Sequence, residues 1–197
     1  MRLTLSSPAS LGPALPRCHA LPADSGVPVG ASGQPGAAAP AGFHALWRSA
    51  AVGAGDRAAG AARAAAECVL TYGVLHDAGL VVTATAPRAA VGVTLVQAIG
   101  IGRLRLLAPC RIVAVEESPE RSGFTYATLP GHPEQGEETF MITRADDGTV
   151  WATVSSLSRP AALAARIGAP LAARAQRAVV GRYLAAIARA ADAAVHR

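Results

Sequence analysis

Four residues that could do chemistry lie close together near the middle of this chain. His132, Glu134, Glu137 and Glu138 fall within seven residues, and imidazoles and carboxylates are the groups that ligate metals or move protons. A zinc or non-haem iron site requires two or three imidazoles or thiolates in a fixed geometry, and this stretch holds one. We therefore expect no metal ion and no cofactor here, with His132 capping a turn and the glutamates pairing with arginines.

Two alternating runs flank this polar stretch and predict a β-hairpin. Residues 124–129 and 137–143 are separated by a turn rich in Pro and Gly. Side chains alternate between the two faces of a strand, so if Phe140 and Ile142 face the core, Glu138 faces it too. The same face is shared by three residues of the partner strand, Phe124, Tyr126 and Thr128.

An inward Glu138 admits two interpretations. Burial beside aromatic rings raises the pKa of a carboxyl toward neutrality, which suits a general acid or base, and His132 is the second candidate for that role. The other interpretation is a buried glutamate paired with an arginine, Arg111 or Arg159, that ties the sheet to its neighbour. We favour the second interpretation, because buried ionised groups are normally paired.

The cysteines and glycines offer no further catalytic motif. Cys18, Cys68 and Cys110 form no CxxC pair, and neither Cys68 nor Cys110 has a histidine in its motif. The sequence also contains no Gly-x-Ser-x-Gly elbow and no phosphate-binding glycine loop. We expect reduced thiols, and with them a cytoplasmic protein.

The net charge of +5 does not by itself indicate a nucleic-acid partner. All 18 basic residues are arginine, and no recognition motif or aromatic stacking platform accompanies them. We therefore expect no nucleic acid to bind. No uncharged apolar run approaches the roughly 18 residues that a membrane-spanning helix needs.

The segments that must position these residues can be followed in chain order. Residues 1–25 are rich in Pro, Gly, Ala and Ser, and we expect them to be disordered or loosely attached to a single domain at 26–197. A short strand is predicted at 43–52. Asp56 then provides an N-cap for a helical segment that reaches about residue 77.

Six further strands and a long helix complete the predicted domain. β-branched and alternating runs, separated by turn residues, place strands at 80–86, 91–99, 103–115, 124–129, 137–143 and 149–157. Ser158 and Pro160 predict the start of the C-terminal helix, and residues 168–170 predict a kink. Apolar residues then recur every four positions, opposite a face rich in arginine.

This order of elements indicates an α+β fold in which a curved antiparallel sheet of about six to seven strands wraps around the C-terminal helix. It is similar to the helix-grip architecture of START-like and birch-pollen-allergen-like domains. Such a fold leaves room for a cavity between the sheet and the helix.

One block of sequence carries a closer resemblance. The run Gly-Phe-Thr-Tyr-Ala-Thr-Leu-Pro-Gly-His-Pro-Glu-Gln-Gly-Glu-Glu at 123–138, with Pro-Cys-Arg-Ile-Val at 109–113, resembles the bacterial and plant nineteen-ninety family of domains of unknown function. The resemblance extends from about residue 29 to about residue 184, and Ala127 and the Ser-Leu pair at 156–157 depart from it. The family has no agreed activity, so the resemblance implies the fold and leaves the function open.

These observations lead to one expected function and two alternatives. We expect the domain to bind a small hydrophobic or amphipathic molecule between the sheet and the C-terminal helix. The residues expected to contact it are Phe124, Tyr126, Thr128, Glu138, Phe140, Thr153 and Tyr183. The first alternative is an enzyme that uses Glu138 or His132 as general acid or base. The second is a membrane-surface or protein-interaction module that uses the arginine-rich face of the helix.

Overall fold

The computed structural model describes residues 3–5, 11–36, 38–101, 104–161 and 169–195. Its strands are β1 (Leu3–Leu5), β2 (His44–Gly53), β3 (Val81–Ala84), β4 (Thr94–Ile101), β5 (Leu104–Glu117), β6 (Arg121–Thr128), β7 (Glu134–Arg144) and β8 (Val150–Pro160). The α-helices are α1 (Leu15–His19), α2 (Ala58–Leu70), α3 (Gly73–Asp77) and α5 (Ala169–Val195). Single 3-10 turns are η2 (Gly12–Ala14), η3 (Ala31–Gly33) and η4 (Gly55–Arg57).

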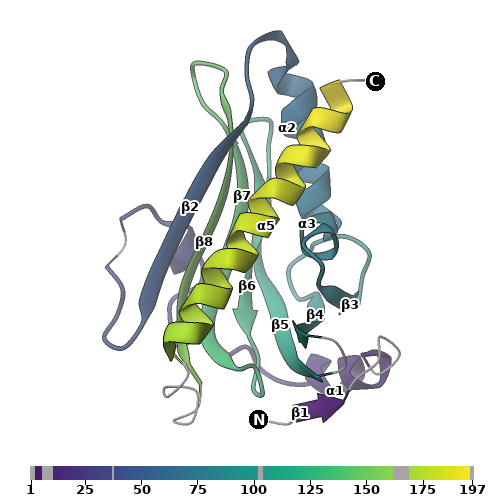
Figure 1. The fold of residues 1–197 in the computed structure, drawn as a ribbon, viewed down its shortest axis with the longest axis vertical. Coiled ribbons are helices and arrows are strands. Elements are labelled where there is room, and N and C mark those ends of the chain that lie inside the picture. The colour runs from purple at the N-terminus through teal and green to yellow at the C-terminus, as the bar shows by residue number, and fades with distance from the viewer. Residues whose placement is uncertain (1–2, 6–10, 37, 102–103, 162–168, 196–197) are drawn as a thin grey trace.

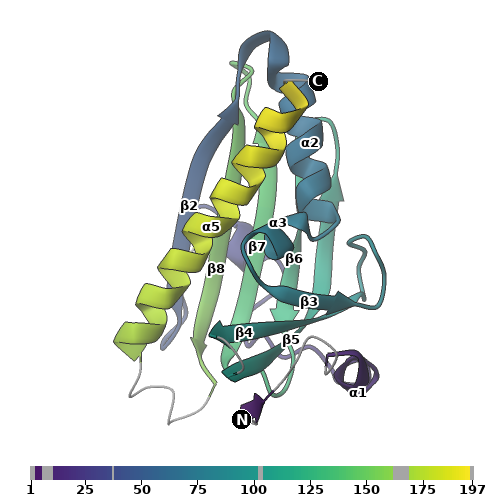
Figure 2. The same cartoon turned by 45° about the vertical axis from the view of Figure 1, so that its right-hand side comes forward.

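The strands form one curved antiparallel sheet with the order β2-β8-β7-β6-β5-β4-β3, and β1 pairs with β5 beside this path. From β3 to β8, strands that follow each other in sequence lie side by side, while β2 closes the far edge next to β8. Helices α2, α3 and α5 lie on one side of the sheet, and α5 crosses it diagonally (Figures 1 and 2). The predicted α+β helix-grip fold is confirmed.

The helix start predicted at Ser158 and Pro160 is wrong. Ser158 does not cap a helix, because β8 continues to Pro160 and Ser158 pairs with Gly136 of β7 and His44 of β2. A strand bonded on both sides retains its extended backbone against a local helix-start signal. The described part of α5 covers Ala169–Val195, and the predicted kink at 168–170 falls partly at residues outside the described ranges.

The helical segment after β2 also differs from the prediction. Asp56 makes no side-chain cap, since η4 precedes α2 and the helix starts at Ala58. The segment divides into α2 and α3 at Tyr72, whose φ of 65° lies in the left-handed region. This backbone costs a non-glycine residue about 1 kcal/mol, and burial of the Tyr72 ring edge-on against Phe124 offsets it.

Residues 11–36 lie as a strap along the outer, convex face of the sheet. Leu11 is fully buried and packs against Val96 and Ala98 of β4. The amide of Gly30 donates a 3.0 Å hydrogen bond to the Glu137 carboxylate. The domain boundary near residue 25 stays a prediction.

Candidate functional site

The concave face of the sheet, which faces α5, has an apolar half built around two phenylalanines. Phe124 pairs with Phe140, and Phe140 pairs with Val154 of β8. All three side chains are buried, as the alternation predicted for Phe124 and Phe140. Two residues beyond Phe140 along β7, Ile142 lies opposite Ala152 of β8. The apolar surface therefore continues toward α2.

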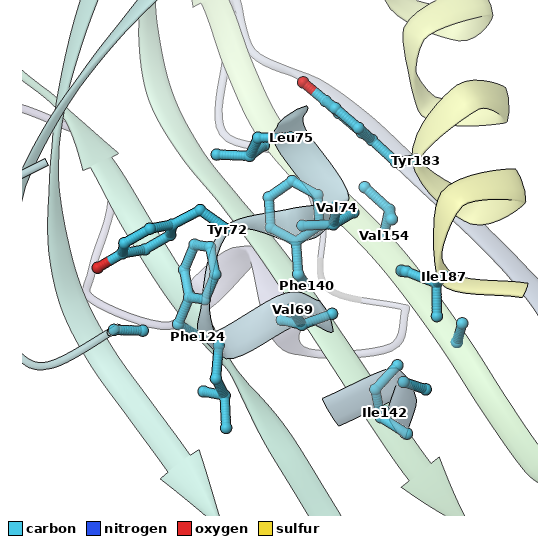
Figure 3. Close-up of a cluster of buried hydrophobic side chains, with 14 of the residues drawn as sticks. Val69, Tyr72, Val74, Leu75, Phe124, Phe140, Ile142, Val154, Tyr183 and Ile187 are labelled. Carbon is cyan, nitrogen blue, oxygen red and sulfur yellow. The ribbon is translucent and has the colours of Figure 1, made fainter. Parts of the chain in front are cut away.

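Aromatic rings fill the space between this apolar half and the C-terminal part of α5 (Figure 3). The Phe140 ring centroid lies 5.4 Å from that of Phe124 and 5.1 Å from that of Tyr183, which reaches in from α5. Tyr72 meets Phe124 edge-on at 6.1 Å. Offset and edge-to-face contacts of this kind are the geometries that aromatic side chains prefer. Phe124, Phe140 and Tyr183 therefore form a packed core at this position.

Two residues along each strand, the same face becomes polar. Tyr126 pairs with Glu138, which pairs with Ser156 of β8. In the next row, the amide of Gly136 donates to the Thr128 hydroxyl at 3.1 Å. We call Tyr126, Thr128, Glu138, Ser156 and Ser158 the polar half of the concave face. It lies toward the end of the sheet where β8 finishes and α5 begins (Figure 1).

Glu138 is the central residue of the polar half. Its carboxylate accepts a hydrogen bond from the Tyr126 hydroxyl, and its side chain is 9% exposed. Burial raises the pKa of Glu138 to about 7, against the lowering effect of the Tyr126 hydrogen bond, and the nearby Glu134 charge raises it further. Burial also raises the pKa of Tyr126 well above its usual value, so the phenol remains the donor.

Neither arginine proposed as a partner for Glu138 contacts it. Arg111 donates to the carbonyl oxygens of Leu21 and His19 in the strap, at 2.7 and 2.6 Å. Arg159 donates to the Gln135 side-chain oxygen and stacks over the Phe43 ring. Within the described ranges, no ion pair involves Glu138. The predicted pairing with Arg111 or Arg159 is therefore wrong, and the carboxyl instead lies beside a cavity.

This cavity has a volume of about 40 Å³. It is bounded by Tyr126, Thr128, His132, Glu134, Gly136, Glu137, Glu138, Ser156 and Ser158. A cavity of this size has room for about three water molecules or one small polar group. Nearly every side chain around it carries an oxygen or nitrogen atom, so it suits a hydrogen-bonding group and not a hydrocarbon.

His132 lies at the edge of this cavity and serves the hairpin turn. The Glu134 amide donates to His132 Nδ1 at 2.9 Å, and the His132 amide donates to Leu129 O at 3.0 Å. Burial lowers the pKa of His132 to about 4, although its hydrogen bond with the Glu134 backbone acts in the opposite direction. His132 is thus neutral at pH 7 and holds the turn, as its interpretation as a turn cap predicted.

Of the seven residues predicted to contact a ligand, Tyr126, Thr128 and Glu138 line this cavity. Phe124, Phe140 and Tyr183 lie in the packed core instead. Thr153 lies on the opposite face of the sheet. It pairs with Met141 and Ser49, and its hydroxyl lies 2.9 Å from that of Ser49 on the convex side. Along β8 the face toward Glu138 belongs to the even-numbered residues Val154 and Ser156. If the alignment of β7 with β8 were known, alternation along β8 would identify Ser156, and not Thr153, as the neighbour of Glu138. The sequence alone does not determine that alignment.

Comparison with known proteins finds relatives by sequence in a bacterium and a plant. A UPF0548 protein of Deinococcus radiodurans is 40% identical over 81 residues, which cover 41% of this chain and 41% of the relative. A UPF0548 protein of Arabidopsis thaliana is 35% identical over 71 residues, covering 33% of this chain and 35% of the relative. The matched region thus spans about two fifths or less of each relative.

Solved structures share the fold at low sequence identity. A hypothetical protein of Helicobacter pylori superposes with a TM-score of 0.57 at 7% identity, covering 83% of this chain and 93% of that one. A point mutant of norcoclaurine synthase from Thalictrum flavum, solved with a transition-state analogue, gives 0.52 at 12% identity, with 76% and 94% covered. Identities this low establish the helix-grip fold alone. The family is set by sequence: the profile of the domain of unknown function DUF1990 matches residues 27–186, and the chain belongs to that family.

Proposed function

We propose that this domain binds a small amphipathic molecule, whose polar group enters the cavity of the polar half and hydrogen-bonds with Glu138. The apolar part of the ligand then lies along the concave face, toward the N-terminal half of α5. Ligand sites commonly combine an apolar wall with a few oriented polar groups. This arrangement refines the expected binding of a hydrophobic or amphipathic molecule, because the apolar half is already occupied by the protein's own rings.

The observation that carries the proposal is the buried carboxyl of Glu138 beside a polar cavity. Leaving a buried carboxyl without a cationic partner disfavours its ionised form, which is why its pKa rises. A ligand that donates a hydrogen bond or brings a positive charge would relieve this cost. Amines and alcohols are therefore the polar groups that fit best.

Native mass spectrometry of the protein purified gently from its host tests the proposal. We expect an adduct of a few hundred daltons on the wild-type protein, held at roughly one per chain. Glu138→Gln should lose most of it, whereas Thr153→Val, on the opposite face, should retain it. An adduct that is equally abundant on both variants, or a wild-type protein without any adduct, would contradict the proposal.

Acid/base catalysis at Glu138 is the second candidate function, and the same carboxyl favours it. A pKa of about 7 keeps Glu138 partly protonated near neutral pH, so it can both give and take a proton. His132 is the weaker candidate, because Nδ1 is engaged by the Glu134 amide. If the protein is an enzyme, the Glu138→Gln variant should bind the co-purified molecule but no longer convert it. If the protein only binds the molecule, both the wild type and the variant should release it unchanged.

The arginine-rich face of α5 remains a separate proposal for contact with an anionic surface. The apolar face of α5 is buried on the sheet through Val180, Tyr183 and Ile187, which leaves exposed Arg182 to meet a partner. None of the helices in the described part of the chain is long and apolar enough to cross a membrane. Pelleting with anionic vesicles at low salt tests this contact, and absence of pelleting would remove it.

A further inference from the structure

A second recess lies away from the polar half, between α2 and the turn that joins β5 to β6. Its volume is about 360 Å³, which falls in the range of small-molecule sites. The α2 helix lies over this end of the sheet (Figure 2). The apolar wall of the groove consists of Ala59, Ala62, Ala66, Leu70 and Ile142. The polar wall consists of Arg63, Glu67, Arg88, Glu117, Ser118, Glu120, Arg121, Ser122 and Arg144, and Pro119 completes the lining.

Most charges around this groove are already paired. Arg88 bridges Glu67 of α2 at 2.8 Å and Glu117 of β5 at 2.6 Å. Arg121 of the polar wall pairs at 2.8 Å with Glu116, which does not itself line the groove. The Arg88 clamp carries one arginine for two glutamates, so an anionic ligand should avoid that end of the groove.

Three charged groups in the groove remain without an ionic partner among the described residues. They are Arg63 on α2, Arg144 at the end of β7, and Glu120 in the β5–β6 turn. Two of these charges are positive and one is negative, so this part of the groove is complementary to a single negative charge. The neighbouring wall of alanines, Leu70 and Ile142 suits a hydrocarbon.

We propose that this groove binds a small monocarboxylate with an apolar body, with its carboxylate held by Arg63 and Arg144. Arginine forms planar, paired hydrogen bonds to a carboxylate and is the side chain best suited to it. The site is distinct from the polar half, whose buried Glu138 would repel a carboxylate. The two sites thus select for opposite polar groups, amine or alcohol at one and carboxylate at the other.

Calorimetric titration with octanoate and with octan-1-ol tests this proposal. We expect saturable binding of octanoate to the wild-type protein, weakened by added salt, and weaker binding of octanol. The Arg63→Gln/Arg144→Gln double variant should bind octanoate about tenfold more weakly, since each exposed ion pair contributes a few-fold. Arg57→Gln is the matched control, because Arg57 is an exposed arginine directly before α2 that does not line the groove.

Two further variants locate the binding. Ala59 is exposed and lines the groove, so Ala59→Leu should fill the space and weaken both ligands without disturbing the core. Thr153→Val, on the convex face and outside the lining of the groove, should leave octanoate binding unchanged. The proposal is overturned if the wild-type protein does not bind octanoate saturably, if the double variant binds it as well as the control does, or if octanol binds equally well. Unchanged octanoate binding in Ala59→Leu would place the ligand outside the groove and also overturn the proposal.

Discussion

The two halves of the concave face share the same strands and the same alternation of side chains, yet they are packed in different ways. In the apolar half, Phe124, Phe140 and Tyr183 fill the space under α5 with rings in mutual contact. In the polar half, two residues further along each strand, Tyr126 and Glu138 face a small cavity instead. The boundary between the packed core and the proposed binding site therefore runs across the strands and not between them.

This difference teaches that burial alone does not distinguish core from site. Glu138 is almost as deeply buried as its neighbours in the apolar half, but burial stabilises a phenylalanine and destabilises an ionised carboxylate. The polar half must therefore be maintained at a cost in folding stability. Substitutions in the two halves should consequently have opposite effects on stability.

Phe140→Ala should have the largest effect, because it empties the centre of the apolar half. Phe140 is fully buried and its ring contacts Phe124, Tyr126 and Tyr183, so the loss should be about 3–5 kcal/mol in the free energy of unfolding. Urea denaturation measures it. Trp47→Ala, which removes an exposed ring, is the control and should cost less than about 1 kcal/mol. Equal effects of the two substitutions would show that the rings of the apolar half are not a core.

Glu138→Gln should have the opposite sign at alkaline pH. The pKa of Glu138 is raised from 4.5 to about 7 in the folded protein, so stability is full below the unfolded pKa and falls as pH rises through 7. A shift of this size corresponds to about 3 kcal/mol. Glutamine cannot ionise, so at pH 8 the variant should exceed the wild type by on the order of 2 kcal/mol, and at pH 4 the two should be similar.

Denaturation of wild type and variant between pH 4 and 8 checks this sign. Burial also raises the pKa of Glu137 to about 7, so the stability of the Glu138→Gln variant should still fall somewhat with rising pH. Glu137→Gln is the matched control for this remaining pH dependence. A Glu138→Gln variant that is less stable than wild type at pH 8 would indicate a cationic partner, and the two halves would then both be structural.

Tyr126→Phe should have a smaller effect that involves both halves. The ring of Tyr126 packs against Phe124 and Phe140, and phenylalanine keeps this ring. The variant loses the hydrogen bond to Glu138, which should lower the free energy of unfolding by about 1 kcal/mol. Because that hydrogen bond lowers the pKa of Glu138, the carboxyl should titrate at higher pH in the variant. If Glu138 titrates with the same midpoint in the wild type and in Tyr126→Phe, the hydrogen bond between the two side chains is excluded.

Thr153→Val should have the smallest effect of the four. Thr153 lies on the convex face and its hydroxyl contacts Ser49, so the change in stability should stay below about 1 kcal/mol. Neither the pH dependence of stability nor the co-purified molecule should change. A shift in either quantity would mean that the two faces of β8 are coupled.

The sequence predicted which residues of the central hairpin share the buried face, because period-two alternation leaves little freedom once one face is apolar. Phe124, Tyr126, Glu138 and Phe140 share the buried face as expected. The helix start predicted at Ser158 and Pro160 is wrong, since pairing with β7 and β2 overrides the local helix-start signal there. Local propensity is a weak guide wherever a strand is bonded on both sides.

The absence of an arginine partner for Glu138 among the described residues could not be predicted, because segments distant in sequence bind the side chains of the candidate arginines. Arg111 is held by carbonyl oxygens of the strap, about ninety residues earlier in the chain. Such contacts have no signature in local spacing. The membership of Ser156 in the polar half likewise depends on the alignment of β8 with β7.

The protonation of Glu138 is the property on which the account of the polar half depends most directly. Carbon-13 NMR of protein labelled at the glutamate carboxyls, with the Glu138 signal assigned from the Glu138→Gln variant, follows it across pH. The structure predicts a midpoint near 7, and a ligand bearing an amine should move that midpoint downward. A midpoint at or below the ordinary value of 4.5 would show a solvated or paired carboxylate and would contradict the assignment of this half as the binding site.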